Sequence, residues 1–150
     1  MTDYSTLPHS IAIMGDGGVG KTSLVDRLVG KVPKKKYLPT RGVEGRYTTL
    51  RGVSFLLWDV GGQDKMGRMM PSAHVDAVIF VYDGSSLLSR KNLRCWKKKA
   101  LKKCGDVPYF VVCNKSDQPL QKTPSSKELC VSALSGQNVD RVSESLITLF

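Results

Sequence analysis

Apolar residues along the chain fall either into short continuous runs or into repeats of three and four residues, and the two patterns alternate. Continuous runs and alternating segments of four to eight residues predict strands. The segments read in this way are 10–15, 44–50, 53–59, 77–82, 109–113 and 129–131. Helical repeats occur at 21–29, 90–103 and 138–149, the last with Val139, Val142, Leu146 and Leu149 on its inner side. The sequence therefore predicts strands and helices in alternation.

This alternation is typical of an α/β fold with a doubly wound, mostly parallel sheet. The segments 44–50 and 53–59 are separated only by Arg51-Gly52, so we expect an antiparallel hairpin at one edge of a six-stranded sheet. The chain of 150 residues is expected to form one domain over 10–150, preceded by a short N-terminal extension over 1–9.

The connection between the predicted strands at 109–113 and 129–131 is too short to contain a helix. Only residues 118–128, with Pro119 and Pro124 among them, separate Asp117 from the last predicted strand. A helix of about 11 residues with its connections does not fit there. We expect the helix before the last strand to be deleted, and the buried strand at 109–113 to be covered by the loop, by a partner or by a second copy.

A glycine-rich loop follows the first strand and precedes the first helix. The eight residues from Gly15 to Thr22 read GDGGVGKT and match the phosphate-loop pattern G-x-x-x-x-G-K-[ST]. In this pattern the backbone N–H groups cradle a triphosphate, the lysine (Lys21) reaches the β/γ-phosphates and the hydroxyl (Thr22) ligates Mg²⁺. The loop alone predicts a P-loop nucleoside triphosphatase and leaves the base open.

The charge of the chain is high and uneven. Its formal net charge is +10, in an otherwise ordinary composition with 41% hydrophobic and 24% charged residues. Eight basic residues and no acidic one lie between Arg90 and Lys103, around an apolar face formed by Leu93, Trp96, Ala100 and Cys104. This segment is either a solvated helix face or a docking surface for an acidic protein or a nucleic acid.

Cysteine usage and the absence of targeting patterns favour the cytosol or the nucleus. Cys95, Cys104, Cys113 and Cys130 show no CxxC pairing, and we expect them to be buried, reduced thiols. No apolar run has the length of a membrane span, and neither end carries a lipidation pattern, so no lipid anchor is expected.

Four further motifs occur in the order found in small GTPases. They are Thr40 after the first helix, Trp58-Asp59-Val60-Gly61-Gly62-Gln63 at a strand end, Asn114-Lys115-Ser116-Asp117 (NKxD) and Ser132-Ala133. With the phosphate loop they make the chain resemble the Ras superfamily, and hence a P-loop G domain. The residues 37–44, the pair Trp58-Asp59 and Val107-Pro108 resemble the Ran branch most, which implies a role in nuclear transport. The sequence of residues 59–63 also resembles the Arf branch.

The resemblance implies a GTP-binding molecular switch. The nucleotide contacts that it implies are Asp16, Gly17, Gly18, Val19, Gly20, Lys21, Thr22, Ser23, Thr40, Gly62, Asn114, Lys115, Asp117, Ser132, Ala133 and Leu134. Asp117 would accept hydrogen bonds from the N1–H and 2-amino groups of guanine, a pair that adenine lacks. Asn114 would bond the base edge, Lys115 would cover the ring, and the Ala133 N–H would meet the guanine oxygen.

The implied chemistry is slow GTP hydrolysis with Mg²⁺. Thr22, Thr40 and Asp59 would hold the metal, and Gln63 would orient the attacking water beside Lys21. No arginine lies at the switch position before Thr40, since Leu38 occupies it, so turnover would be on the order of 10⁻⁴–10⁻³ per second without a partner. Effector and regulator proteins would read the two loops that contact the γ-phosphate.

Two departures from the family pattern keep a second hypothesis open. Val32-Pro33 replaces an aromatic residue that normally packs on guanine, and the helix before the last predicted strand is missing; Leu134 in place of the lysine of the last motif is a minor departure. A GTPase-mimicking module with weak or no hydrolysis, which sequesters regulators or transport receptors, is therefore the alternative. A P-loop kinase or ATPase is a third class, disfavoured by Asn114 together with Asp117.

Overall fold

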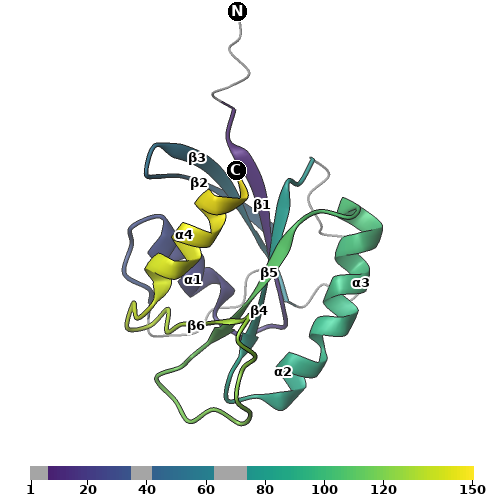
Figure 1. Ribbon diagram of the computed structural model, residues 1–150, viewed down its shortest axis with the longest axis vertical. Coiled ribbons are helices and arrows are strands. Elements are labelled where there is room, and N and C mark those ends of the chain that lie inside the picture. The colour runs from purple at the N-terminus through teal and green to yellow at the C-terminus, as the bar shows by residue number, and fades with distance from the viewer. Residues whose placement is uncertain (1–6, 35–41, 63–73) are drawn as a thin grey trace, which may run out of the picture.

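The computed structural model describes residues 7–34, 42–62 and 74–150, which form one sheet between two layers of helices (Figure 1). The strands are β1 (His9–Met14), β2 (Val43–Leu50), β3 (Val53–Val60), β4 (Ala77–Asp83), β5 (Tyr109–Asn114) and β6 (Leu129–Cys130). The helices are α1 (Lys21–Leu28), α2 (Leu87–Lys91), α3 (Leu93–Cys104) and α4 (Val139–Leu149).

The sheet confirms the predicted topology. Its strand order is β2-β3-β1-β4-β5-β6, and only the β2–β3 pair is antiparallel. The hairpin turn has positive φ at both central residues, 47° at Arg51 and 81° at Gly52, as two-residue hairpins favour. The parallel strands direct their carboxyl ends, and the loops that follow them, to one edge of the sheet.

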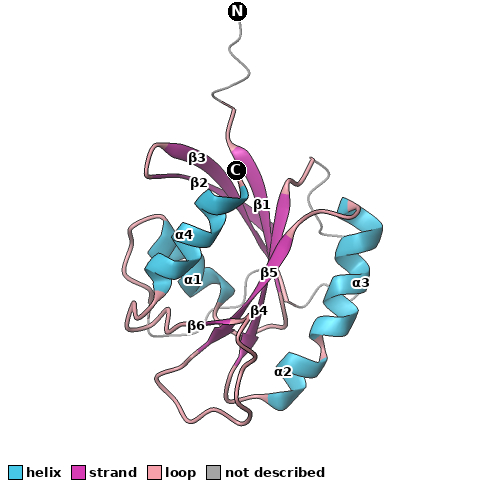
Figure 2. Cartoon of the chain, in the orientation of Figure 1, coloured by secondary structure: helices cyan, strands magenta, loops and turns pink. Residues whose placement is uncertain are grey.

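Alternation along β1 divides the core between the two faces of the sheet. Ile11 and Ile13 belong to a buried cluster with residues of α1 and α4, whereas Ala12 and Met14 belong to a cluster with residues of α3. Figure 2 shows α1 and α4 together on one side of the sheet, and α2 and α3 on the other. The continuous apolar run of β4 is explained by this arrangement, because both faces of the strand are covered.

The predicted basic helix over 90–103 is two helices, so its predicted start was wrong. The helical region begins at Leu87, where the Ser86 hydroxyl caps α2 by accepting from the Ser89 N–H at 3.2 Å. A break at Asn92 separates α2 from α3. Across the described segments, no helix combines the length and the apolar character needed to cross a bilayer.

The prediction that all four cysteines are buried was wrong for Cys95. Cys113 is buried, Cys104 and Cys130 are partly buried, and Cys95 is exposed. Cys95 lies two residues from the inward Leu93, which turns it to the outer side of α3. All four are free thiols, as expected, and burial raises the pKa of Cys113 to about 11.

The helix before β6 is absent, as predicted. Residues 115–128 form turns and an extended loop that returns toward the end of β4. The Gln121 N–H donates to the Gly84 carbonyl at 2.9 Å, and the Tyr82 hydroxyl donates to Glu128 Oε2 at 2.7 Å. Glu128 also pairs with Arg90 of α2 at 3.4 Å. The loop therefore covers the carboxyl ends of β4 and β5.

Candidate nucleotide-binding site

The loop between β1 and α1 lies at the carboxyl edge of the sheet, where ligands bind in doubly wound folds. Gly20 has φ 96°, and a Cβ atom there would lie 2.1 Å from Asn114 Nδ2. Only glycine meets both conditions, because the backbone is left-handed and the space is filled. Since α1 begins at the next residue, the N–H groups of its first turn adjoin the loop, an arrangement that favours anions.

Lys21, the first residue of α1, is buried beneath this loop. Its Nζ donates to the Asp16 carbonyl at 2.7 Å, and the side chain is 5% exposed. Burial lowers the pKa of Lys21 to about 8, although the carboxylates of Asp59 and Asp16 oppose the shift. An anion bound beside this buried ammonium group would raise its pKa toward the usual value.

Thr22 and Asp59 bring two oxygen atoms together beside the loop. The Thr22 hydroxyl donates to Asp59 Oδ2 at 2.5 Å, and Asp59 at the end of β3 is 1% exposed. A hydroxyl that donates its proton in this way keeps its lone pairs for a cation. Within the described segments no group of three His, Cys, Asp or Glu residues could hold a metal by itself. This donor set fits Mg²⁺, which is usually held by one or two carboxylates together with substrate phosphates.

Gly62 lies directly against the phosphate loop. A Cβ atom at Gly62 would lie 2.1 Å from the backbone nitrogen of Gly17, so any side chain there would displace one of the two segments. Gly62, two residues after the end of β3, can therefore approach the phosphate loop this closely only because it has no side chain. The predicted Thr40 and Gln63 lie outside the described residues, so their roles stay predictions.

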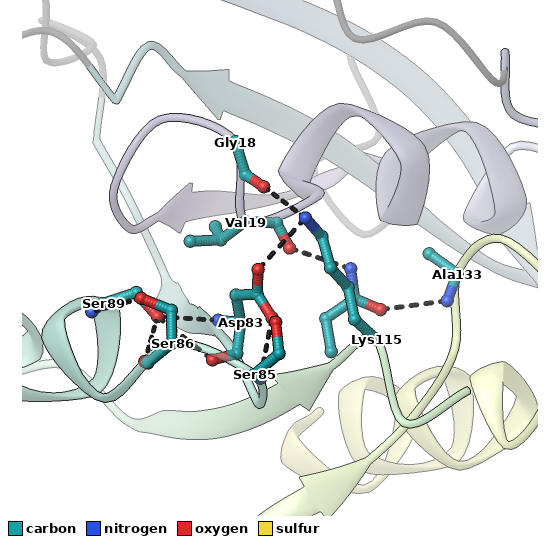
Figure 3. A network of polar contacts seen from close by, with 9 residues as sticks. Gly18, Val19, Asp83, Ser85, Ser86, Ser89, Lys115 and Ala133 are labelled. Atoms are coloured by element: carbon teal, nitrogen blue, oxygen red, sulfur yellow. Dashed lines mark hydrogen bonds and ion pairs between the residues drawn. The ribbon is translucent and has the colours of Figure 1, made fainter. Parts of the chain in front are cut away.

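The NKxD motif at the end of β5 is tied to the phosphate loop by two side chains. Asn114 Nδ2 donates to the Val19 carbonyl at 2.9 Å, and Lys115 Nζ donates to the Gly18 carbonyl at 2.8 Å (Figure 3). The Asn114 oxygen accepts from the Ala133 N–H at 3.0 Å. Asn114 and Ala133, both predicted to contact the base, thus contact each other, and Asn114 joins three loops.

Asp117 and the loop after β6 form the outer part of the site. Asp117 is exposed, and its Oδ1 accepts from the buried Ser132 hydroxyl at 2.6 Å. This bond orients the carboxylate and leaves it accessible to the N–H donors of a base. Leu134, two residues after Ser132, is half exposed, and Ser23 is half-buried in the first turn of α1.

Arg27 on α1 is a residue that the sequence analysis missed. Its Nε donates to the Ala133 carbonyl at 2.8 Å, and its Nη2 donates to the Leu134 carbonyl at 2.6 Å. These bonds fix the loop after β6 to the helix that follows the phosphate loop. An arginine in the last turn of a helix gives no signal in sequence that separates it from a solvated charge.

Two carboxylates also act in ways that the sequence did not indicate. Asp16 accepts from the Trp96 indole N–H at 2.9 Å and from Asn92 Nδ2 at 2.6 Å, which joins the phosphate loop to α3. Asp83, at the end of β4, pairs with Lys115 at 3.1 Å. Burial alone would raise the pKa of Asp83, but the hydrogen bonds from Ser85 and the Lys115 ammonium outweigh it and lower the pKa.

A family model, described as Ras of Complex, Roc, domain of DAPkinase, matches residues 10–117. The match runs from β1 through the phosphate loop to the aspartate of the NKxD motif, and it leaves out the rest of the β5–β6 crossover and the loop after β6. It spans more than two thirds of the chain and agrees with the sheet topology and with the glycine-rich loop between β1 and α1. The chain belongs to the Roc family of Ras-like GTPase domains.

Proposed function

We propose that this protein is a guanine-nucleotide switch that binds GTP with Mg²⁺ and hydrolyses it slowly to GDP and phosphate. Membership of a Ras-like GTPase family supports nucleotide binding at the level of the family. The observation that carries the proposal for this chain is the connection of the phosphate loop to the NKxD motif through Asn114 and Lys115. These bonds hold the phosphate-binding and base-binding parts at a fixed separation before a ligand arrives.

Asp117 is the proposed determinant of base selectivity. Its exposed carboxylate, oriented by Ser132, can accept two hydrogen bonds from the guanine N1–H and 2-amino groups. Adenine offers no such pair at the same edge, and an unmatched polar group in a binding site costs a large factor in affinity. The nearby Lys115 stem supports the ring.

Hydrolysis is assigned to residues by resemblance. Gln63 is proposed to orient the attacking water, Lys21 to stabilise the phosphates, and Thr22, Thr40 and Asp59 to hold Mg²⁺. Because Leu38 stands where some GTPases carry an arginine, an activating protein is proposed to supply the missing positive charge. Effectors would then distinguish the GTP form from the GDP form through the loops of Thr40 and Gly62.

The finer predictions of a Ran-like protein and of nuclear transport are not supported by the family match, which names another Ras-like family. They stay hypotheses that rest on residues 37–44, on the Trp58-Asp59 pair and on Val107-Pro108. The cytosolic or nuclear location stays an untested prediction that rests on cysteine usage and on the absence of targeting patterns. A pull-down with the GTP-loaded and GDP-loaded forms of the chain tests them, because a transport role requires receptors that bind only one form.

The alternative is a nucleotide-binding module that recruits partners with little or no hydrolysis. Val32 favours it, because this residue stands in the stretch where an aromatic side chain usually packs on guanine, and it is 78% exposed. Loss of that apolar contact would speed nucleotide release, so the bound state would be short-lived.

Phosphate release from GTP in a single turnover separates the two hypotheses. A switch releases phosphate at a slow rate that falls at least tenfold in Gln63→Ala and is unchanged in the control Gln118→Ala, an exposed glutamine at the end of the NKxD turn. Tight GTP binding without any phosphate release, with or without an activating protein, would favour the recruiting module instead.

A further inference from the structure

The sheet face on the side of α3 is only partly covered. Tyr109, Val111, Cys113 and Cys130 share this face, since Tyr109 packs edge-on against Phe80 and the others belong to the cluster beneath α3. Cys113 is fully buried, but Val111 and Cys130 are partly exposed and Tyr109 is 54% exposed. The exposed part therefore lies at the amino half of β5 and along the edge strand β6.

The shortened crossover explains why this part is open. Parallel neighbours are usually joined by a helix that packs on the sheet, and the β4–β5 crossover carries α2 and α3 in this way. The β5–β6 crossover has no helix, and Gln121 and Glu128 of its loop bond to the carboxyl end of β4 and to Arg90 of α2. Figure 1 shows α2 and α3 on this side of the sheet and a loop without a helix between β5 and β6.

The flank of α3 toward this opening is both basic and apolar. Lys97 Nζ lies 5.2 Å from the centroid of the Tyr109 ring, which fixes the side of α3 that faces β5. Leu101 follows one turn later, 60% exposed, and Arg94 and Lys98 are exposed on the same flank. In the segments that the structure describes, no carboxylate forms an ion pair with Arg94, Lys97 or Lys98.

Cations that no carboxylate of the described segments pairs thus lie beside exposed apolar side chains, and this combination indicates one kind of occupant. We propose that the surface formed by Arg94, Lys97, Lys98, Leu101, Tyr109 and Val111 binds an acidic amphipathic helix of a partner protein, in the place of the missing crossover helix. The apolar face of that helix would cover Leu101, Tyr109 and Val111, and its carboxylates would pair with the three cations.

Charge and apolarity together separate this occupant from the others. A nucleic acid would use the cations and leave the aliphatic Leu101 and Val111 in water. A second copy of this chain would bring another α3 of the same charge against the first, and repulsion would oppose it. Neighbouring like charges on α3 destabilise the isolated helix, and a partner's carboxylates would remove that repulsion.

A displayed library of 18-residue helices, with apolar and polar positions randomised, tests the proposal against the full chain. The expected result is enrichment of amphipathic helices with strongly negative net charge. Their synthetic peptides should lose at least tenfold in affinity for the Lys97→Glu/Lys98→Glu variant and for Leu101→Ser/Tyr109→Ser. Raising the salt concentration should weaken the contacts of the peptides with Lys97 and Lys98 more than the contacts with Leu101 and Tyr109.

The matched control is Lys31→Glu/Arg141→Glu, which makes the same change of charge at exposed positions away from α3. It should change peptide affinity less than twofold. Enriched helices without net negative charge, equal binding to the Lys97→Glu/Lys98→Glu variant, or a chain that dimerises through this surface in sedimentation would each overturn the proposal, as would an RNA duplex that competes fully for it.

The result does not depend on the proposed function, because none of the six residues of this surface is a proposed nucleotide contact. GTP binding is measured on the same variants, and unchanged affinity shows that they are folded. A chain that binds acidic helices but no nucleotide would refute the proposed function alone. The opposite result would refute only the inference.

Discussion

The two ends of β5 differ in how their side chains are covered and bonded. At the carboxyl end of β5, Asn114 is 2% exposed, and its side chain bonds to two other loops. At the amino end of the same strand, Tyr109 is half exposed, and its ring packs edge-on against Phe80. One strand thus supplies a preorganised polar site at one end and an open apolar surface at the other.

The difference shows where the shortened crossover removed material and where it did not. The bonds of Asn114, Lys115 and Arg27 hold the nucleotide loops without any help from the missing helix. Only the face of β5 and β6 on the side of α3 is left partly exposed. A Ras-like domain can therefore lose this helix and keep its candidate site, provided that the loop is anchored through Glu128.

Replacement of Lys21 should have the largest effect at the closed end. Lys21→Ala removes the buried ammonium group that would contact the phosphates, and we expect nucleotide affinity to fall at least 100-fold. Stability of the free chain should be unchanged or higher, because a cation whose pKa is lowered by burial destabilises the folded state at neutral pH. Titration with a fluorescent GTP analogue and urea unfolding measure the two effects. Lys31→Ala is the control, and a large loss of stability in Lys21→Ala would contradict this account.

Replacement of Asn114 tests the connection among the three loops. Asn114→Ala leaves the buried Ala133 N–H and the Val19 carbonyl without their partner, which costs about 2–3 kcal/mol of unfolding free energy. Asn114→Asp keeps one acceptor for Ala133 and should lose part of that amount. Equilibrium urea unfolding measures both, and equal stability of the wild type and Asn114→Ala would show that these bonds are not formed.

The pKa of Lys21 predicts how nucleotide affinity depends on pH. Phosphate favours the charged ammonium, so affinity should be constant below pH 8 and fall above it, by about tenfold between pH 7 and pH 9. Lys21→Arg stays charged over this range, so its affinity should not show the same fall. A wild-type profile that is flat up to pH 9.5 would contradict the lowered pKa.

Replacement at the open end should have the smallest effect. Val111→Ser exposes little that is not already accessible, and we expect a change in unfolding free energy below about 1 kcal/mol. Val112→Ser, at the adjacent fully buried position on the other face, is the matched control and should cost about 2 kcal/mol or more. Equal losses at the two positions would show that the α3 face is closed.

Features repeated over many residues could be predicted from the sequence, and features set by single tertiary contacts could not. The strands, the hairpin at Arg51-Gly52 and the missing crossover helix follow from patterning, turn residues and segment length. The break at Asn92 could not be predicted, since the basic residues on both sides of it read as one helix. The exposure of Cys95 follows from which side of α3 meets the sheet.

The residues of the candidate site also separate into those that a sequence pattern indicates and those that depend on single tertiary contacts. The phosphate loop and the NKxD motif carry their chemistry in their spacing, so their residues were found from sequence. Arg27, Asp83 and the contact of Asp16 with Trp96 depend on elements that meet only in the fold, and no local pattern distinguishes them. The base contact of Asn114 stays a prediction, whereas its observed bonds to two other loops could not be predicted from its residue type.

Nucleotide titration by calorimetry in the presence of Mg²⁺ decides whether the site selects guanine. We expect GTP and GDP to bind at least 100-fold more tightly than ATP and ADP, and Asp117→Ala to remove most of this preference. Equal affinity for guanine and adenine nucleotides, or no binding of either, would contradict this expectation.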